Sequence, residues 1–184
     1  MKYWLLIFCA IGHSNFAQTK EEKLVELINL VRTDPKGFVT SHLKPYLETH
    51  EQDDDSYANS LLAELEIKTK VEPLTLSAQL SKVSKQHAID LGKKGQVGHS
   101  SSDGTTFDKR LRNRVKAGGA MGENCDYGNE EPLDILMSLL IDEGITSLGH
   151  RKNLLEARFK FIGIAIEPHK KYRMSCVMDF AEKL

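Results

Sequence analysis

The chain has 184 residues, of which 40% are hydrophobic and 28% charged, and its 25 Lys and Arg residues nearly balance 26 Asp and Glu residues. These values are typical of one globular domain that can bury its own core without a metal or disulfide scaffold. A net charge of −1, with no basic stretch interleaved with aromatic residues, argues against nucleic acid as a partner.

The N-terminal residues predict a secretory signal peptide. Lys2 is followed by an apolar run over residues 3–11 and by a small, polar stretch over residues 12–17, which is the order of regions in such leaders. Cleavage after Ala17 would leave one domain over residues 18–184, without a transmembrane segment. We therefore expect a protein that is secreted, periplasmic or held at the cell surface. A buried first strand or helix of the domain is the alternative.

Cleavage would also remove Cys9 and leave two cysteines, Cys125 and Cys176. Disulfides persist in exported proteins, so this pair is a candidate bridge. It would close a loop of about fifty residues and stabilise the fold by about 4 kcal/mol in the chain-entropy model. Two buried free thiols are the alternative.

The first half of the mature chain predicts helices and one acidic loop. Thr19 and Glu22 have the spacing of a capping box, and the helix after them should end before Pro35. Pro35 can start a second short helix that reaches about residue 43. Residues 50–60, which include four acids between Glu51 and Asp55, predict a solvated loop.

Three more helices are expected further along the chain. Ser77 can cap a helix that ends near Gly92. A glycine- and serine-rich loop leads to a basic helix over about residues 106–116. Pro132 opens a helix with a broad apolar stripe, which we expect to end at Gly144.

Strands are concentrated near the C-terminus. A short strand is expected over residues 123–127, and two longer ones over residues 161–166 and 173–180, the last with alternating apolar and polar residues. Helices first and strands later, without regular alternation, predict an α+β fold in which helices pack on an antiparallel sheet.

Two histidines and two acids are the candidate functional residues. His99 and His150 each follow a glycine in a loop, Glu123 lies between a glycine and an asparagine, and Asp142 ends the apolar helix with Glu143 beside it. Imidazole nitrogens and carboxylate oxygens suit zinc, copper, nickel or iron. Alternatively, a carboxylate can orient a histidine as a general base. On spacing alone, either histidine can also serve as a structural hydrogen-bonding residue.

Several short segments also occur in a characteristic order. In chain order they are Asn29-Leu30-Val31-Arg32, His87-Ala88, Gly98-His99-Ser100, Gly122-Glu123-Asn124, Gly149-His150-Arg151-Lys152-Asn153-Leu154-Leu155, Phe161-Ile162-Gly163-Ile164-Ala165 and Asp179-Phe180-Ala181. From about residue 22 to residue 182 the chain resembles the CAP superfamily, the cysteine-rich secretory, antigen 5 and pathogenesis-related proteins with an SCP domain. The form of the second histidine segment is similar to that of the bacterial branch.

The resemblance implies an α-β-α sandwich with a central antiparallel sheet and a large cavity that carries two histidines and two acids. His99 and His150 match the two histidines, and Glu123 matches the first acid. The second acid of the family is a Glu three residues after a Trp. Leu139 stands at the Trp position here, which places Asp142 at the acid, one methylene shorter, with Glu143 as the other candidate.

The resemblance implies an extracellular module more than an enzyme. We expect the tetrad of two histidines and two acids to bind a divalent cation, with zinc as the favoured metal, beside a small or lipid ligand. The expected partner is a lipid, a peptide or a component of the cell envelope. The alternative is a metal-assisted or Glu-His-assisted, peptidase-like hydrolase acting on extracellular or cell-envelope substrates. Its candidate catalytic residues are Glu123, His99 and His150. A shared fold does not decide between these functions.

Overall fold

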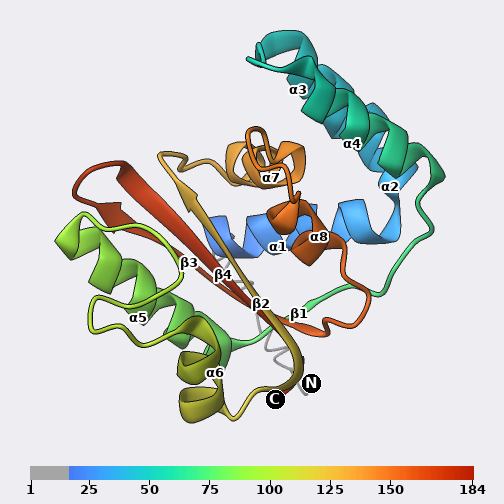
Figure 1. Cartoon of the computed structure of the whole chain (residues 1–184). Helices are drawn as coiled ribbons and strands as arrows, with labels where there is room; N and C mark the ends of the chain where they lie inside the picture. Colours follow the sequence, from blue (N-terminus) through green and yellow to red (C-terminus); the bar gives the residue numbers. More distant parts are fainter. Residues whose placement is uncertain (1–16) are drawn as a thin grey trace, which may run out of the picture.

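The computed structural model describes residues 17–184, so the signal peptide predicted for residues 1–17 lies outside the described residues, apart from Ala17. A sheet stands between two layers of helices, and a third group of helices extends beyond it (Figure 1). The α-β-α sandwich expected from the sequence is therefore confirmed. None of the helices in the described residues is both long and apolar enough to cross a membrane.

The sheet contains four strands in the order β1-β3-β4-β2. Their bounds are Thr75–Leu76 for β1, Gly118–Tyr127 for β2, Phe161–His169 for β3 and Arg173–Lys183 for β4. β4 runs antiparallel to both β2 and β3, as predicted, whereas the two residues of β1 pair parallel to β3. The sheet is therefore mixed. The long stretch of chain between β1 and β3 permits this, since parallel pairing requires a crossover connection.

One helical layer consists of α1 (Lys20–Thr33), α7 (Pro132–Ile141) and α8 (Gly149–Leu155). The predicted capping box of α1 is confirmed, since Thr19 and Glu22 each accept a hydrogen bond from the other's backbone N–H. The largest core cluster lies in this half of the molecule, and its fully buried members include Leu24, Ile28, Leu136, Leu140 and Phe180.

Residues 35–67 form a helical arm. It consists of α2 (Pro35–Phe38), a π-helical turn η1 (Val39–Leu43), α3 (Lys44–Thr49) and α4 (Asp55–Ile67). The solvated loop predicted for residues 50–60 is therefore shorter than expected. Asp54 accepts a hydrogen bond from the N–H of Ser56 and starts α4, because aspartate is a good N-cap.

The other face of the sheet carries α5 (Ala78–Lys94) and α6 (Phe107–Val115). α5 approaches β3 closely at both of its ends. A Cβ atom on Gly163 would lie 2.3 Å from the backbone of Leu80, and one on Gly92 would lie 2.3 Å from the Pro168 carbonyl oxygen. Only glycine allows these two contacts, which seat α5 directly on the strand.

The predicted disulfide between Cys125 and Cys176 is wrong. Both cysteines are buried and free. In the register of β2 and β4, Cys125 lies opposite Val177, while Asp126 lies opposite Cys176. Because successive side chains of a strand point to opposite faces, the two thiols lie on different sides of the sheet and cannot form a bond. Cys176 joins the large core, and Cys125 faces Ala88 on α5.

Candidate functional site

The predicted histidines and acids form two hydrogen-bonded pairs. His99 Nδ1 lies 2.9 Å from Glu123 Oε1, and His150 Nδ1 lies 2.7 Å from Asp142 Oδ1. His99 belongs to the loop that follows α5, whereas Glu123 lies on β2. The second pair connects the end of α7 with the first turn of α8.

Asp142 has three structural roles in the second pair. It takes the left-handed conformation, with φ of 58°, and so ends α7 two residues before the predicted Gly144. Its Oδ2 accepts hydrogen bonds from the N–H groups of His150 (2.9 Å) and Arg151 (3.3 Å), which lie in the first turn of α8. One carboxylate therefore caps α8 and orients the imidazole of the same turn.

Glu143, the other candidate for the fourth position, faces elsewhere. Its Oε1 accepts a hydrogen bond from the backbone N–H of Asp54, at the start of α4. The side chain therefore connects the end of α7 to the helical arm. Of the two neighbouring acids, the structure brings Asp142 to His150.

Glu123 occupies a buried polar cluster. Its side chain is fully buried, and its Oε2 forms an ion pair with Arg110 of α6. Asp179, its partner on β4, is also buried and accepts a hydrogen bond of 2.7 Å from Ser84 of α5. Burial and the charge of Glu123 raise the pKa of Asp179 well above its usual range, so of these two carboxyl groups Asp179 gives up its proton less readily.

The environment also shifts the pKa values of the first pair. Burial opposes the ionisation of Glu123, but the hydrogen bond from His99 and the charge of Arg110 bring its pKa below the ordinary value. The hydrogen bond to Glu123 raises the pKa of His99 above 6.5, against the effect of its partial burial. The pair therefore favours an ionised carboxylate beside a protonated imidazole.

A further histidine, His87 on α5, lies behind this pair. Its Nε2 lies 3.9 Å from Glu123 Oε1 and 3.1 Å from the carbonyl oxygen of Gly98. His87, Glu123 and Cys125 form a buried group whose ligand atoms all lie within 4.8 Å of one another and could hold a metal ion. From the sequence, His87 was named only within one of the ordered segments and was given no part in the site. A histidine among apolar residues was the available signal, but its neighbours depend on the fold.

The four predicted residues do not form one compact ligand group of this kind in the described part of the chain. Cys125 lies between the two pairs, since its Sγ is 3.9 Å from His99 Nδ1 and it lines the same pocket as Asp142 and His150. Asn124 donates to the carbonyl oxygen of His150 at 3.0 Å and so ties β2 to α8. β2 thus contacts both pairs through Cys125 and Asn124, and the second pair lines the pocket.

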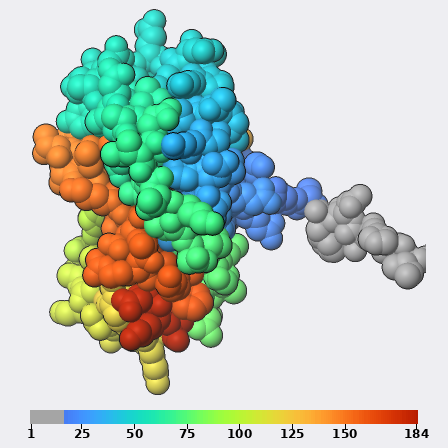
Figure 2. Space-filling model, turned by 90° about the vertical axis from the view of Figure 1, so that its right-hand side faces the viewer, coloured from blue at the N-terminus to red at the C-terminus, as the bar shows by residue number. Residues whose placement is uncertain are grey.

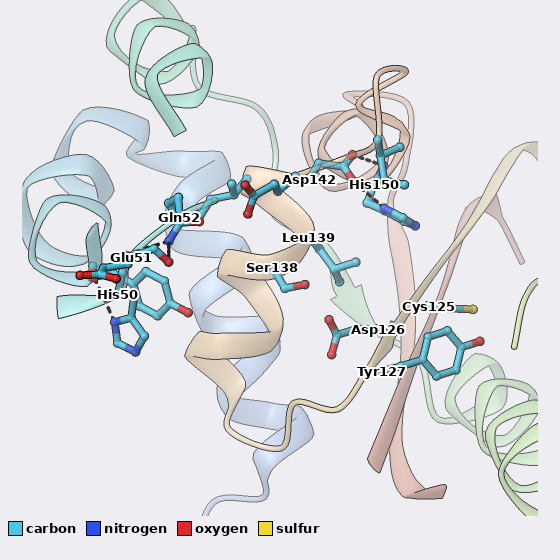
Figure 3. A pocket seen from close by; sticks show the side chains of 14 residues that line it. His50, Glu51, Gln52, Cys125, Asp126, Tyr127, Ser138, Leu139, Asp142 and His150 are labelled. Atoms are coloured by element: carbon cyan, nitrogen blue, oxygen red, sulfur yellow. Dashed lines mark hydrogen bonds and ion pairs between the residues drawn. The ribbon is translucent and has the colours of Figure 1, made fainter. Parts of the chain in front are cut away.

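The pocket beside His150 has a volume of about 460 Å³. Figure 3 shows it between the loop that follows α3, the helix α7 and the strand β2, with His50 and Glu51 on one side and Cys125 and Tyr127 on the other. No Lys or Arg is among the described residues that line it. The lining residues are Tyr46, His50, Glu51, Gln52, Cys125, Asp126, Tyr127, Ser138, Leu139, Ile141, Asp142, Glu143, Ile145 and His150.

The donor set fits a divalent cation. Both pairs use Nδ1 of the imidazole, and no hydrogen bond among the described residues uses Nε2 of His99 or His150. A carboxylate on one ring nitrogen commonly orients the other toward a metal and raises its basicity. Glu123 and Asp142 therefore orient the two imidazoles and leave Nε2 of each ring as the nitrogen that could bind a metal.

The fold and these pairs define the class of protein: an α-β-α sandwich with two histidine–acid pairs, one of which lines a polar pocket. The model of the cysteine-rich secretory protein family, CAP, matches residues 25–180. The chain therefore belongs to the CAP family. A search of the curated proteins returned no match.

Two solved structures have a similar fold. An extracellular protein containing an SCP domain from Bacillus anthracis aligns with 21% identity and a TM-score of 0.53, over 69% of this chain and 39% of that one. An outer surface protein from Borrelia burgdorferi aligns with 19% identity and a TM-score of 0.52, over 73% of this chain and 97% of that one. This chain thus corresponds to less than half of the Bacillus protein, and at these identities the likeness concerns the fold.

Proposed function

We propose that this CAP protein is an exported, non-catalytic module that binds a divalent cation through Nε2 of His99 and His150. Zinc is the favoured metal. The observation that carries the proposal is the pairing of both Nδ1 atoms with carboxylates, Glu123 and Asp142. Zinc would supply a Lewis acid at the edge of the pocket. The pocket combines carboxylates and tyrosines with Leu139 and Ile145, which suits a small amphipathic ligand beside the ion.

Export is proposed from two observations. The first residues have the pattern of a signal peptide. The two similar structures are described as an extracellular protein and an outer surface protein. N-terminal sequencing of protein recovered from the medium or envelope should begin at Gln18. Retention of Met1 in an exported sample would contradict the cleavage site.

Calorimetry with zinc near neutral pH tests the metal proposal. The wild-type protein should bind zinc, and the double variant His99→Ala, His150→Ala should lose binding at least about a hundredfold. His42→Ala, at a histidine that stacks on Phe38 away from the pairs, is the matched control and should bind as the wild type does. Equal zinc binding in the wild type and the double variant would overturn the proposal, as would no binding by either.

One observation favours the hydrolase as a second candidate. The ionised Glu123 holds Nδ1 of His99, whose side chain is 51% exposed, and this is how a carboxylate orients a general base. A peptidase of this kind should lose turnover in Glu123→Gln while remaining folded. No turnover by the wild-type protein over a broad panel of peptide and cell-envelope substrates would contradict the hydrolase.

A further inference from the structure

Charge is strongly segregated along the chain. Residues 45–67 contain seven acids and no Lys or Arg, whereas residues 78–116 contain nine Lys and Arg and three acids. The first segment belongs to α3 and α4, and the second to α5, α6 and the loop between them. Figures 1 and 2 place these two regions at opposite ends of the molecule. The molecule therefore has an acidic end and a basic end, although the net charge of the chain is only −1.

A groove of about 540 Å³ lies between α5 and α6 at the basic end. Its cationic side chains are Lys82 from α5, and Arg114 and Lys116 from the end of α6. Val83 and Val115 add apolar surface, and Gln86 bonds to Arg114. We call these three cations and the surface between them the α5–α6 groove. It contains neither of the histidine–acid pairs.

In the described part of the chain the three groove cations form no ion pair with a carboxylate. Within residues 17–184, no ion pair involves Lys82, Arg114 or Lys116, although Lys85 on the same helix pairs with Glu167 at 2.9 Å. The two acids that precede Arg114 most closely in the chain, Asp108 and Asp103, accept hydrogen bonds from Thr106 and Thr105, and the charge of Arg114 is among the causes that lower the pKa of Asp103. The positive charge of the groove is therefore available to an external anion.

The backbone at Lys116 supports a role for this side chain. Lys116 ends α6 in the left-handed region with φ of 54°, a conformation that glycine or asparagine adopts at lower cost. Strained positions of this kind concentrate at functional sites. Here the strain puts a charged side chain, rather than a glycine, at the edge of the groove.

The shape and composition of the groove restrict its ligand. Its lining contains no aromatic residue on which a nucleic acid base could stack. It is concave, whereas a bilayer surface would need a flat or protruding patch. Lysine and arginine together suit phosphate and sulfate, since arginine can donate two parallel hydrogen bonds to such groups.

We propose that the α5–α6 groove binds a linear polyanion of phosphate or sulfate groups that carries no aromatic bases. The proposal does not depend on metal binding at the histidines. Inorganic polyphosphate is the probe, and its affinity is measured by calorimetry at several salt concentrations. The groove variant is Lys82→Gln, Arg114→Gln, Lys116→Asn, in which asparagine retains the left-handed backbone.

The control variant Lys36→Gln, Lys44→Gln, Lys70→Gln removes three exposed cations that lie outside the basic segment. The groove variant should lose at least about tenfold in affinity. The slope of the logarithm of affinity against the logarithm of salt concentration should become shallower by about one for each lost contact. The control, with the same change in net charge, should stay within about twofold of the wild type. Circular dichroism confirms that both variants remain folded.

Several results would overturn the proposal. Equal loss in the two variants would mean that only net charge matters. Tighter binding of single-stranded DNA than of polyphosphate through the same three residues would indicate a nucleic acid ligand. Binding to vesicles containing phosphatidylglycerol without binding to polyphosphate would indicate a membrane surface. No binding of polyphosphate by the wild-type protein at low salt would also refute it.

Discussion

At the scale of single residues, the His99–Glu123 pair makes the site sensitive to pH. The raised pKa of His99 contributes stability that is complete below about 6.5 and is lost as pH rises through the pKa in the folded protein. The lowered pKa of Glu123 contributes stability above about 4.5, which is lost as pH falls through its pKa in the folded protein. The pair therefore stabilises the fold most between these two values.

We expect Glu123→Gln to lower the pKa of His99 toward its ordinary value, because the hydrogen bond that His99 donates to the ionised carboxylate is the largest cause of the shift. Nuclear magnetic resonance of the imidazole protons measures this directly. The chemical shifts of the His42 ring protons at a fixed pH should be the same in both proteins. An unchanged pKa of His99 would show that Glu123 does not hold the ring in solution.

Two substitutions at position 142, to asparagine and to alanine, distinguish the effect of the Asp142 charge from the structural roles of its side chain. Asparagine tolerates the left-handed backbone and can cap α8, so Asp142→Asn should change the free energy of unfolding by less than about 1 kcal/mol. Its amide would donate to Nδ1 of His150 and place the ring proton on Nε2. Zinc affinity should therefore fall about 10–100-fold.

Asp142→Ala should lose the same zinc affinity and also about 1–3 kcal/mol of stability, because two backbone N–H groups would lose their acceptor. Urea unfolding and calorimetry separate the two effects. Equal stability of the alanine and asparagine variants would contradict the capping role, and unchanged zinc affinity in both would contradict the orienting role.

At the scale of elements, Arg151 fixes the position of α8 and hence of His150. Its buried guanidinium donates to the carbonyl oxygens of Leu140 and Ile141 at the end of α7, and to Tyr57 and Ser60 of α4. These contacts join three helices at one side chain. Lysine cannot reproduce the planar arrangement of donors.

Arg151→Lys should therefore cost about 2–4 kcal/mol in the free energy of unfolding, since several buried carbonyl groups lose their donors. Urea unfolding measures the loss. Lys152→Arg, at the exposed neighbouring position on α8, is the control and should change stability by less than about 0.5 kcal/mol. A loss below about 1 kcal/mol in Arg151→Lys would mean that α8 is held mainly by its apolar contacts.

The elements themselves were largely predictable from local signals. Thr19, Ser77 and Pro132 mark helix starts by their own chemistry, and these starts are confirmed. The end of α7 was not predictable in this way, because the left-handed Asp142 is stabilised by its hydrogen bonds to the first turn of α8. β1 also escaped prediction, since its two residues become a strand only through pairing with β3.

At the scale of the whole molecule, the site was predicted only in part. The motif order indicated His99, His150, Glu123 and Asp142, and the structure joins them as two pairs. The role of His87 and the charge of the α5–α6 groove could not be predicted, because both depend on how α5 lies against β2 and α6. The predicted disulfide failed for a similar reason: spacing along the chain does not reveal the face of a strand.

The chemistry of the thiols depends on this arrangement. Burial raises the pKa of both Cys125 and Cys176 well above the usual range, so neither forms a reactive thiolate in the folded protein. Protein denatured without reductant should contain as many thiols as cysteines, as counted with Ellman's reagent, and reductant should not change its thermal midpoint. A count of two thiols fewer than the number of cysteines would show that a disulfide is present after all.

The alternation of faces along β2 and β4 has a consequence during folding. Shifting β2 by one residue would bring Cys125 opposite Cys176, where a bond could form, and would place Glu123 opposite Met178 of the large core. In an oxidising compartment, a Cys125–Cys176 bond would therefore trap the chain in a misaligned sheet with a carboxylate in its apolar interior. Free thiols at Cys125 and Cys176 therefore accompany the native register of β2 and β4, and a bond between them would indicate the shifted one.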